Sequence, residues 1–536
     1  MHRCLLLLIL LATPCAAQHS EASHVTSPGP ITDSTPIGRY DRAVLGGFGR
    51  RVSTGSAEAQ AYFDQGVTFM YAFDVHGARR SFRMAERADP ACAMCFWGEA
   101  WALGPYLNEG MDAANVRRAF DAVRTAGRLV KKSGTAVELD LVRALAARYG
   151  TATDTLARRR LDSAYAAAMG SVAAGRPTDV DVQTLYAESL MLLEPRRGTW
   201  SLDKPSVREI HRVLGGAVEQ DVRHPGACHL YIHATETTPD AGKAATCAEL
   251  LGQSIPGASH INHMPSHTWN RVGRWGDAVR ANLEAVHSDQ RAAVGEGFAI
   301  YPSHNLHMLL FAASMDGQGA VAAQAARDFA RLVKGGQFYQ GLVAVRFGRF
   351  DDALDLRTAP EPPVFRGMWA FARGYAHLRT GQADSARIYL AVVDSLRDAL
   401  PDSQGFRGHP PRQLLGLTGD VLRGELLRAD GRIEEGVAAL ERAAAVEDAL
   451  RYDEPEPLPF AARDWLGAAL LEAGRAETAE RVYREALTRR PNNGWDLLGL
   501  AEALEAQRKT ADAERASAEF RAAWVRADTW VRGSRF

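Results

Sequence analysis

Histidines are concentrated in the middle of this sequence. Ten of the sixteen fall between His211 and His307. Seven of these stand in three short clusters, where neighbours are three or four residues apart, a spacing that places side chains on one face of a helix. The clustered residues are His229, His233, His260, His263, His267, His304 and His307. Each cluster therefore predicts a helix that presents two or more imidazoles in one direction.

Imidazoles in this number indicate a transition-metal site. Neutral imidazole is the commonest metal ligand in proteins, and pairs four residues apart on a helix are a known way to hold one ion. Glu236, three residues after His233, adds a carboxylate. Nitrogen and carboxylate ligands suit zinc, copper or iron rather than calcium or magnesium. The set exceeds what one four-coordinate ion needs, so we expect two ions, or one ion with further histidines around its ligands.

Two carboxylates are candidates for a catalytic role beside a metal-bound water. They are Glu236 and Glu188, and Glu188 stands on a predicted helix just before the His-rich segment. A hydrolytic ion would lower the pKa of its water toward about 7, and one of these groups would handle the proton. Copper would allow oxidative chemistry instead. The other interpretation of Glu188 is a solvated helix carboxylate, and the sequence leaves open whether the protein is an enzyme.

A metal-free function is the alternative. The histidines, together with Asn262, Asn270 and Asn305, would then line a groove and form hydrogen bonds to a peptide, a protein partner or a small molecule. The metal content of the purified protein separates the two hypotheses.

The elements that carry these residues are predicted to be helical hairpins. From residue 57 onward the spacing of apolar residues is almost entirely helical. Small and large residues recur at fixed offsets, as in Gly66, Ala78 and Phe82, and again in Gly467, Ala479 and Tyr483. A small residue lets the second helix approach closely, and a large one fills the space between hairpins. We expect an all-α, right-handed superhelix of antiparallel hairpins, an α-solenoid.

These spacings resemble the tetratricopeptide repeat (TPR) family over most of residues 57–528. Further motifs resemble those of a widespread group of bacterial TPR proteins. They are the HxxxH of 229–233, the His-Met-Pro-Ser-His of 263–267, the segments 301–307 and 89–98, and Tyr452-Asp-Glu-Pro455. In TPR proteins the helix positions that these histidines occupy face the concave groove. The resemblance therefore implies that the three clusters line one inner surface; it implies no particular substrate.

The N-terminus predicts export. Arg3 precedes a short apolar run, and Cys15-Ala16-Ala17 ends residues 1–17 as a signal peptide, with cleavage expected after Ala17. The run is too short to span a membrane, so the mature protein is predicted to be periplasmic or secreted and free of the membrane. Residues 18–56 read as a disordered leader. Three repeat regions are expected to follow: 57–200, the His-rich 201–335, and 336–536 with a final capping helix.

Composition excludes several other functions. The 536 residues are 46% hydrophobic and 24% charged, and the formal net charge is −1, which does not favour a nucleic-acid partner. Phosphate-loop, dinucleotide and Gly-x-Ser-x-Gly motifs are missing from the sequence. Four cysteines remain after cleavage, Cys92, Cys95, Cys228 and Cys247, and we expect a structural disulfide or buried thiols. The sequence does not predict an oligomeric state.

Overall fold

A computed structural model describes residues 35–150, 155–195 and 200–536. These parts of the chain fold into helices and short turns and contain no β-sheet, so the prediction of an all-α protein is confirmed. Among the described helices, none has the length and apolar character needed to cross a bilayer. The signal peptide predicted for residues 1–17 lies outside the described residues.

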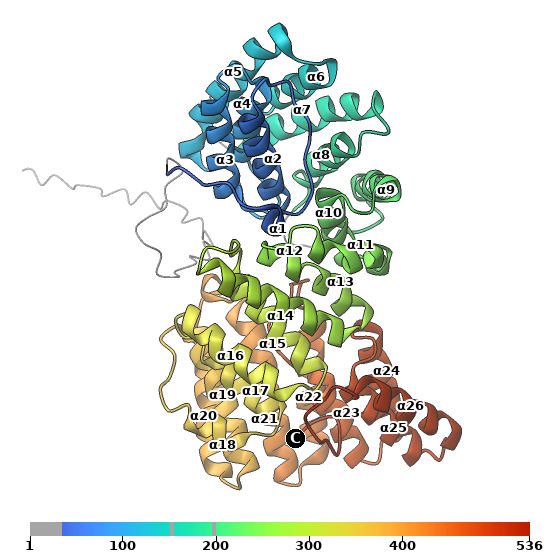
Figure 1. The fold of residues 1–536 in the computed structure, drawn as a ribbon. Helices are drawn as coiled ribbons and strands as arrows, with labels where there is room; N and C mark the ends of the chain where they lie inside the picture. The colour runs from blue at the N-terminus through green and yellow to red at the C-terminus, as the bar shows by residue number, and fades with distance from the viewer. Residues whose placement is uncertain (1–34, 151–154, 196–199) are drawn as a thin grey trace, which may run out of the picture.

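The helices follow one another along the chain with short connections (Figure 1). The first part contains α1 (Arg42–Leu45), α2 (Ala57–Tyr71), α3 (Val75–Ala88), α4 (Ala93–Leu103), α5 (Val116–Ser133), α6 (Ala136–Ala146), α7 (Thr155–Ala174), α8 (Val180–Met191) and α9 (Pro205–Gln220). The middle contains α10 (Pro225–Glu236), α11 (Ala245–Leu250), α12 (Ser259–His263), α13 (Pro265–Val272), α14 (Trp275–Ala292), α15 (Pro302–Met315) and α16 (Gly319–Leu332). The last part contains α17 (Phe338–Arg346), α18 (Phe350–Asp355), α19 (Pro363–Arg379), α20 (Ala383–Ala399), α21 (Pro411–Ala429), α22 (Ile433–Asp448), α23 (Ala462–Glu472), α24 (Ala476–Arg489), α25 (Gly494–Ala506) and α26 (Thr510–Ala523).

Close helix packing at glycines forms the hairpins. Gly467 in α23 and Gly499 in α25 both lie against the ring of Tyr483 in α24; a Cβ atom at either position would come within 2.2 Å of the ring. Tyr483 is fully buried and its hydroxyl lies 2.8 Å from Ser534 Oγ. The predicted pattern of small residues facing a large one is confirmed here, and it explains why neighbouring helices can stack so closely.

The described helices share one continuous core. Most buried apolar side chains from Ile37 to Ala516 form one large cluster, and two small clusters, around Trp275 and around Ala344, complete it. Figure 1 shows the His-bearing helices α10, α12, α13 and α15 between the N-terminal helices and the C-terminal ones. This central position leaves the histidines covered from both ends of the chain.

The C-terminal repeats return to the middle of the molecule. The indole N–H of Trp275 donates to the Pro491 carbonyl at 3.0 Å, and that of Trp495 donates to the Ser314 carbonyl at 3.0 Å. Arg526, after the last helix, forms an ion pair with Asp316 at 2.7 Å. The superhelix therefore closes on itself, and the connection between α22 and α23 is brought over the His-rich helices.

The prediction of a disordered leader is wrong for residues 35–56. The Tyr40 N–H donates to Gln65 at 2.9 Å, and the Arg50 guanidinium pairs with Asp179 at 3.0 Å and with Asp181 at 2.8 Å. These contacts hold residues 35–56 against α2 and the N-terminal end of α8. Residues 18–34 lie outside the described residues.

All four cysteines expected in the mature chain are paired. Disulfides join Cys92 to Cys95 at the start of α4, and Cys228 in α10 to Cys247 in α11. Of the two alternatives that the sequence left open, disulfides and buried thiols, the structure has disulfides. The second bond connects a His-bearing helix to its neighbour, and it limits how far α10 can move from α11.

The packing of Gly467 leads to a test. Gly467→Ala should lower the free energy of unfolding by about 1–3 kcal/mol, because the added methyl group must displace the Tyr483 ring. Gly127→Ala in α5 is the matched control, since nothing lies within 4 Å of a Cβ there and alanine favours the helix by about 0.5–1 kcal/mol. Urea titration followed by circular dichroism measures both, and equal stability of the two variants would contradict this packing.

Candidate metal centre

Four helices carry the clustered histidines. His229 and His233 lie on α10, with Glu236 as its last residue, as the spacing predicted. His260, His263 and His267 were expected on one helix, but Pro265 opens a new one, so His260 and His263 end α12 and His267 lies on α13. His304 and His307 lie on α15.

The first group of imidazoles consists of His229, His233 and His260, which we call triad 1. One ring nitrogen of each lies within 4.8 Å of the others. The Nε2 atoms of His229 and His260 are 3.1 Å apart, and His229 Nδ1 donates to the Tyr71 carbonyl at 2.6 Å. The Phe73 ring covers the triad, with its centroid 4.3 Å from that of His229. Triad 1 is therefore a dry, tightly packed set of nitrogens.

The second group, triad 2, consists of His263, His267 and His304, again with one nitrogen of each within 4.8 Å of the others. The Nε2 atoms of His263 and His267 are 2.9 Å apart. His263 Nδ1 donates to Asn282 Oδ1 at 3.1 Å, and the amide N–H of Asn282 donates to the Ala278 carbonyl at 2.8 Å. The second bond fixes which end of the Asn282 amide faces the imidazole.

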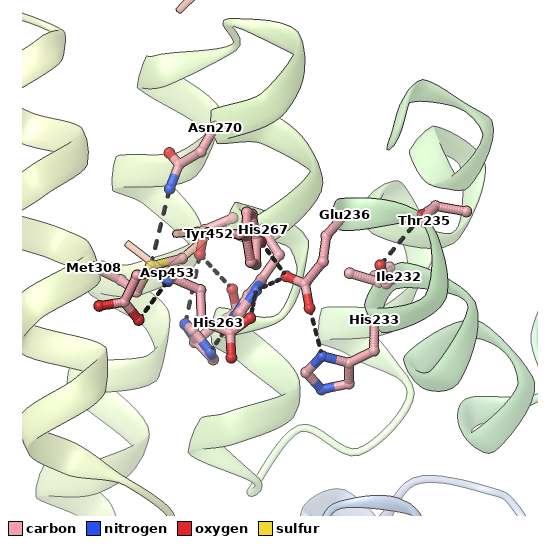
Figure 2. Close-up of polar contacts among 12 residues, drawn as sticks. Ile232, His233, Thr235, Glu236, His263, His267, Asn270, Met308, Tyr452 and Asp453 are labelled. Atoms are coloured by element: carbon pink, nitrogen blue, oxygen red, sulfur yellow. Dashed lines mark hydrogen bonds and ion pairs between the residues drawn. The ribbon is translucent and has the colours of Figure 1, made fainter. Parts of the chain in front are cut away.

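Glu236 connects the two triads. Its Oε1 accepts from His233 Nδ1 at 2.9 Å, and its Oε2 accepts from His267 Nδ1 in a shorter bond. The Tyr452 hydroxyl also donates to Oε2, at 3.0 Å. Figure 2 shows Glu236 between the two histidines, with Tyr452 beside them. Since both oxygens are engaged, Glu236 is a positioning residue in this structure rather than an open catalytic base.

These contacts assign the protons on four rings. In each of these rings Nδ1 faces an acceptor. His229 faces the main-chain carbonyl of Tyr71, and His263 faces the side-chain carbonyl of Asn282. Both His233 and His267 face the carboxylate of Glu236. In the neutral form a histidine that donates through Nδ1 carries a lone pair on Nε2. The Nε2 atoms of His229, His233 and His263 are thus free of a ring proton in the neutral form, as a metal requires, and that of His267 reaches this state when the ring loses its second proton. Metal-binding histidines typically show this arrangement of acceptors behind the ring.

Burial keeps most of these rings neutral. The pKa values of His260, His263 and His304 lie well below the usual value, because burial disfavours the charged form and neighbouring imidazoles add to the effect. His267 is the exception: burial opposes its charge, but the carboxylates of Glu236 and Glu454 outweigh it and raise its pKa to about 9. Burial, and then the charge of Glu454, raise the pKa of Glu236 to about 7.

Two residues expected at the site lie apart from it. His307 belongs to neither triad; its Nε2 lies 2.5 Å from the Tyr339 hydroxyl, which donates to the Pro457 carbonyl at 3.0 Å. It supports the connection over the site, because α15 turns His307 away from His304. Glu188 accepts from the Trp101 indole at 3.0 Å and is buried near Arg148. It is neither the expected base beside the metal nor a solvated carboxylate.

Sequence analysis missed several residues that the fold brings to the site. Glu454 contacts His267 Nδ1 at 3.5 Å, and with Glu236, His233 and His267 it forms a third group of clustered ligand atoms. The segment 452–455 had been noted only as a shared motif. Asn282 and the Tyr71 carbonyl carried no signal, because an ordinary helix asparagine and a main-chain oxygen gain their roles only from tertiary contacts.

The inner surface that carries the clustered histidines is covered rather than open to solvent. Six of the seven clustered histidines are buried, with at most 4% of each side chain exposed, and only His304 is intermediate. The residues 450–461 between α22 and α23 cover the inner surface, held by the ion pair of Arg407 with Asp453 at 2.7 Å. An enclosed site of this kind suits an ion better than an extended peptide.

Comparison with known proteins concerns the fold alone. No protein-family model and no curated protein matches the chain. Similar solved structures include a human IFIT1 dimer with m7Gppp-AAAA, at 11% identity over 88% of this chain and 90% of that one, with a TM-score of 0.31. The match to the P58(IPK) TPR domain covers 85% of this chain and 99% of that one, at 11% identity and a TM-score of 0.23. The match to Cut9–Hcn1 covers 88% of this chain and 74% of that one, at 13% identity and a TM-score of 0.29.

The segment behind triad 1 gives a pH-dependent prediction. Asp181 accepts from the Tyr71 hydroxyl at 2.6 Å and pairs with His224 at 3.0 Å and Arg50 at 2.8 Å. Burial opposes the Asp181 charge, but these partners hold its pKa well below the usual range. A carboxyl group whose pKa is lower in the folded state stabilises the fold at every pH above its pKa in the unfolded chain, about 3.9. This stabilisation is lost as the pH falls from there toward the pKa in the folded state.

Asp181→Asn should therefore lower the free energy of unfolding by about 2–3 kcal/mol at pH 7, with a smaller difference from wild type at pH 3. Urea titrations at the two pH values measure this. Asp384→Asn, whose side chain is fully exposed beside Arg387, is the control and should change stability by less than about 0.5 kcal/mol. A difference for Asp181→Asn that does not depend on pH would contradict the role of its charge.

Proposed function

We propose that the protein binds two transition-metal ions, one in each triad. The observation that carries the proposal is the set of acceptors behind His229, His233, His263 and His267, which places the lone pair of each neutral ring on Nε2. Without an ion, the paired Nε2 atoms are joined by N–H···N hydrogen bonds, in which His260 donates to His229 and the protonated His267 donates to His263. A metal ion would replace these protons and use the nitrogens that the acceptors leave available.

The separations between nitrogens support this proposal. Zinc–nitrogen bonds of about 2.0–2.1 Å at a tetrahedral angle place two ligand nitrogens about 3.3 Å apart. The paired Nε2 atoms lie 3.1 Å apart in triad 1 and 2.9 Å apart in triad 2. Each pair therefore lies within about 0.4 Å of the separation that two ligands of one ion require.

The donor sets favour zinc, copper or iron. Three imidazole nitrogens form each triad, and such a set leaves a fourth position for water or a substrate. With zinc or iron, a bound water becomes acidic enough to attack an ester or amide; with copper, redox chemistry becomes accessible. Glu454 lies beside His267 and, with Glu236, places carboxylate groups next to triad 2 that could exchange a proton there. We include a metal-dependent enzymatic activity in the proposal on this basis.

Export to the periplasm or outside the cell is also part of the proposal. The two disulfides support it, because bonds of this kind persist in oxidising compartments. The signal-like sequence of residues 1–17 adds an independent argument. In such a compartment the site would draw its ions from the surroundings of the cell.

Metal analysis of paired variants tests the two sites separately. The wild-type protein, prepared without chelator or His tag, should contain about two equivalents of metal. His229→Ala with His260→Ala should remove the ion of triad 1, and His263→Ala with His304→Ala that of triad 2, since each change deletes two of three ligands. Inductively coupled plasma mass spectrometry gives both numbers, and circular dichroism confirms that the variants are folded.

The exposed His287 provides the control, because His287→Ala removes an imidazole far from any ligand group and should keep full metal content. If the purified wild-type protein contains no metal and takes up none when dialysed against metal ions, the metal proposal is wrong. The metal-free scaffold that binds a peptide or small molecule would then be the better description.

The acceptor behind His263 gives a sharper test. Asn282→Ala should weaken binding at triad 2 by about 10–100-fold without touching a ligand, because the ring loses the group that fixes its orientation and proton. Asn282→Asp keeps an acceptor and should retain most of the affinity. Competition against a coloured chelator measures both constants, and equal affinities for wild type and Asn282→Ala would show that this contact has no part in metal binding.

A further inference from the structure

A cavity lies beside triad 2 and is large enough for a small molecule. It has a volume of about 340 Å³, within the range of ligand sites, and His267 forms part of its wall. The rest of the wall comes from α13, α14 and α15 on one side and from the connection after α22 and the end of α24 on the other. The cavity thus exists only where the returning C-terminal repeats meet the His-bearing helices.

The charged groups of the cavity are mostly committed to one another. Buried Arg490 pairs with Glu447 at 3.2 Å and with Glu456, and Arg489 pairs with Asp448 at 2.9 Å. The charges of these two arginines are thus balanced by carboxylates, although Nε and Nη1 of Arg490 have no hydrogen-bond partner among the described residues. The cavity carboxylates are engaged as well, since Asp453 and Glu454 contact Arg407 and His267.

Arg271 and Arg451 also line the cavity, and neither forms an ion pair within the described parts of the chain. Arg271 is half-buried, and its Nε–H is buried with no hydrogen-bond partner among the described residues. An unpaired guanidinium donor in such a place costs free energy unless a ligand accepts from it. Carboxylate and phosphate groups match the planar guanidinium best.

The position of Arg271 relates this cation to the metal site. Arg271 follows His267 by four residues on α13, so the two side chains lie on the same face about 5–6 Å apart at their Cβ atoms. An anionic group held by Arg271 therefore places its substituents within reach of an ion at triad 2. The same side of the cavity also carries apolar side chains, those of Trp275, Met308 and Phe311, with the rings of Trp275 and Phe311 6.2 Å apart.

We infer that this cavity binds a small anionic molecule with an apolar body, with Arg271 holding its carboxylate or phosphate next to the metal of triad 2. The inference deepens the proposed function by naming the class of substrate, and it rests on that proposal for the chemistry at the metal. Arg451 is exposed and adds positive charge at the entrance, while Asn270, whose Oδ1 is buried without a hydrogen-bond partner in the described structure, can accept from a donor on the ligand.

Calorimetric titration with three probes tests the inference on the full chain. Phenyl phosphate and phenylacetate carry the two anionic groups on the same ring, and benzyl alcohol is the neutral analogue. We expect at least one of the anions to bind both the chelator-treated and the metal-loaded protein at least tenfold more tightly than benzyl alcohol. The anion that binds more tightly shows whether the site prefers phosphate or carboxylate.

Arg271→Gln should weaken the preferred anion at least tenfold and leave the metal content unchanged. Arg489→Gln is the matched control: it removes another cavity arginine, one already paired with Asp448, and should change the affinity less than twofold. Thermal melts of both variants check folding. If the two variants behave alike, or if neither anion binds better than benzyl alcohol, the inference is overturned.

The chelator-treated protein separates this inference from the metal proposal. Anion binding that depends on Arg271 in a chain that takes up no metal would support the anion site and overturn the metal centre. Two equivalents of bound metal together with no anion binding would overturn the anion site alone.

Discussion

The buried carboxylate of Glu236 is the interaction on which the centre depends. A carboxylate taken out of water is costly unless donors surround it, and Glu236 obtains them from His233 on its own helix, from His267 on α13 and from Tyr452. These three donors come from parts of the chain far apart in sequence. Satisfying one charge therefore brings α10, α13 and the connection after α22 to one place. The two triads lie on either side of that carboxylate, so their relative positions follow from it.

Closure of the superhelix provides the cover over the histidines that the central helices do not provide themselves. In an array of stacked hairpins the inner surface stays open unless some element fills it. Here the last repeats turn back, and Trp275, Trp495 and Asp316 mark the contacts through which they hold the middle of the molecule. The connection that follows α22 then lies over the histidines and excludes water. Lower polarity strengthens every electrostatic interaction within, including those between an ion and its ligands.

Charge balance would link a metal centre to the cavity. Divalent ions held by neutral imidazoles would leave a large excess of positive charge, and the nearby carboxylates of Glu236 and Glu454 would offset only part of it. An anionic molecule in the adjoining cavity would complete that balance, oriented by Arg271, which forms no ion pair within the described parts of the chain. In the proposed function, the electrostatics that stabilise a buried ion thus favour one class of substrate. The apolar side chains of the cavity would then select for an anion with a hydrophobic body.

The sequence by itself determined the helical hairpins and the histidines that belong together. Both depend on local periodicity: three- and four-residue spacing fixes which side chains share a helix face, and Gly467 facing Tyr483 follows from the repeat. Tertiary structure decided the rest. Glu454, Asn282 and the Tyr71 carbonyl enter the site through contacts between distant segments, and nothing in their local sequence marks them. His307 and Glu188 left the site for the same reason: spacing places a residue on a helix face, but only the packing of helices determines what that face meets.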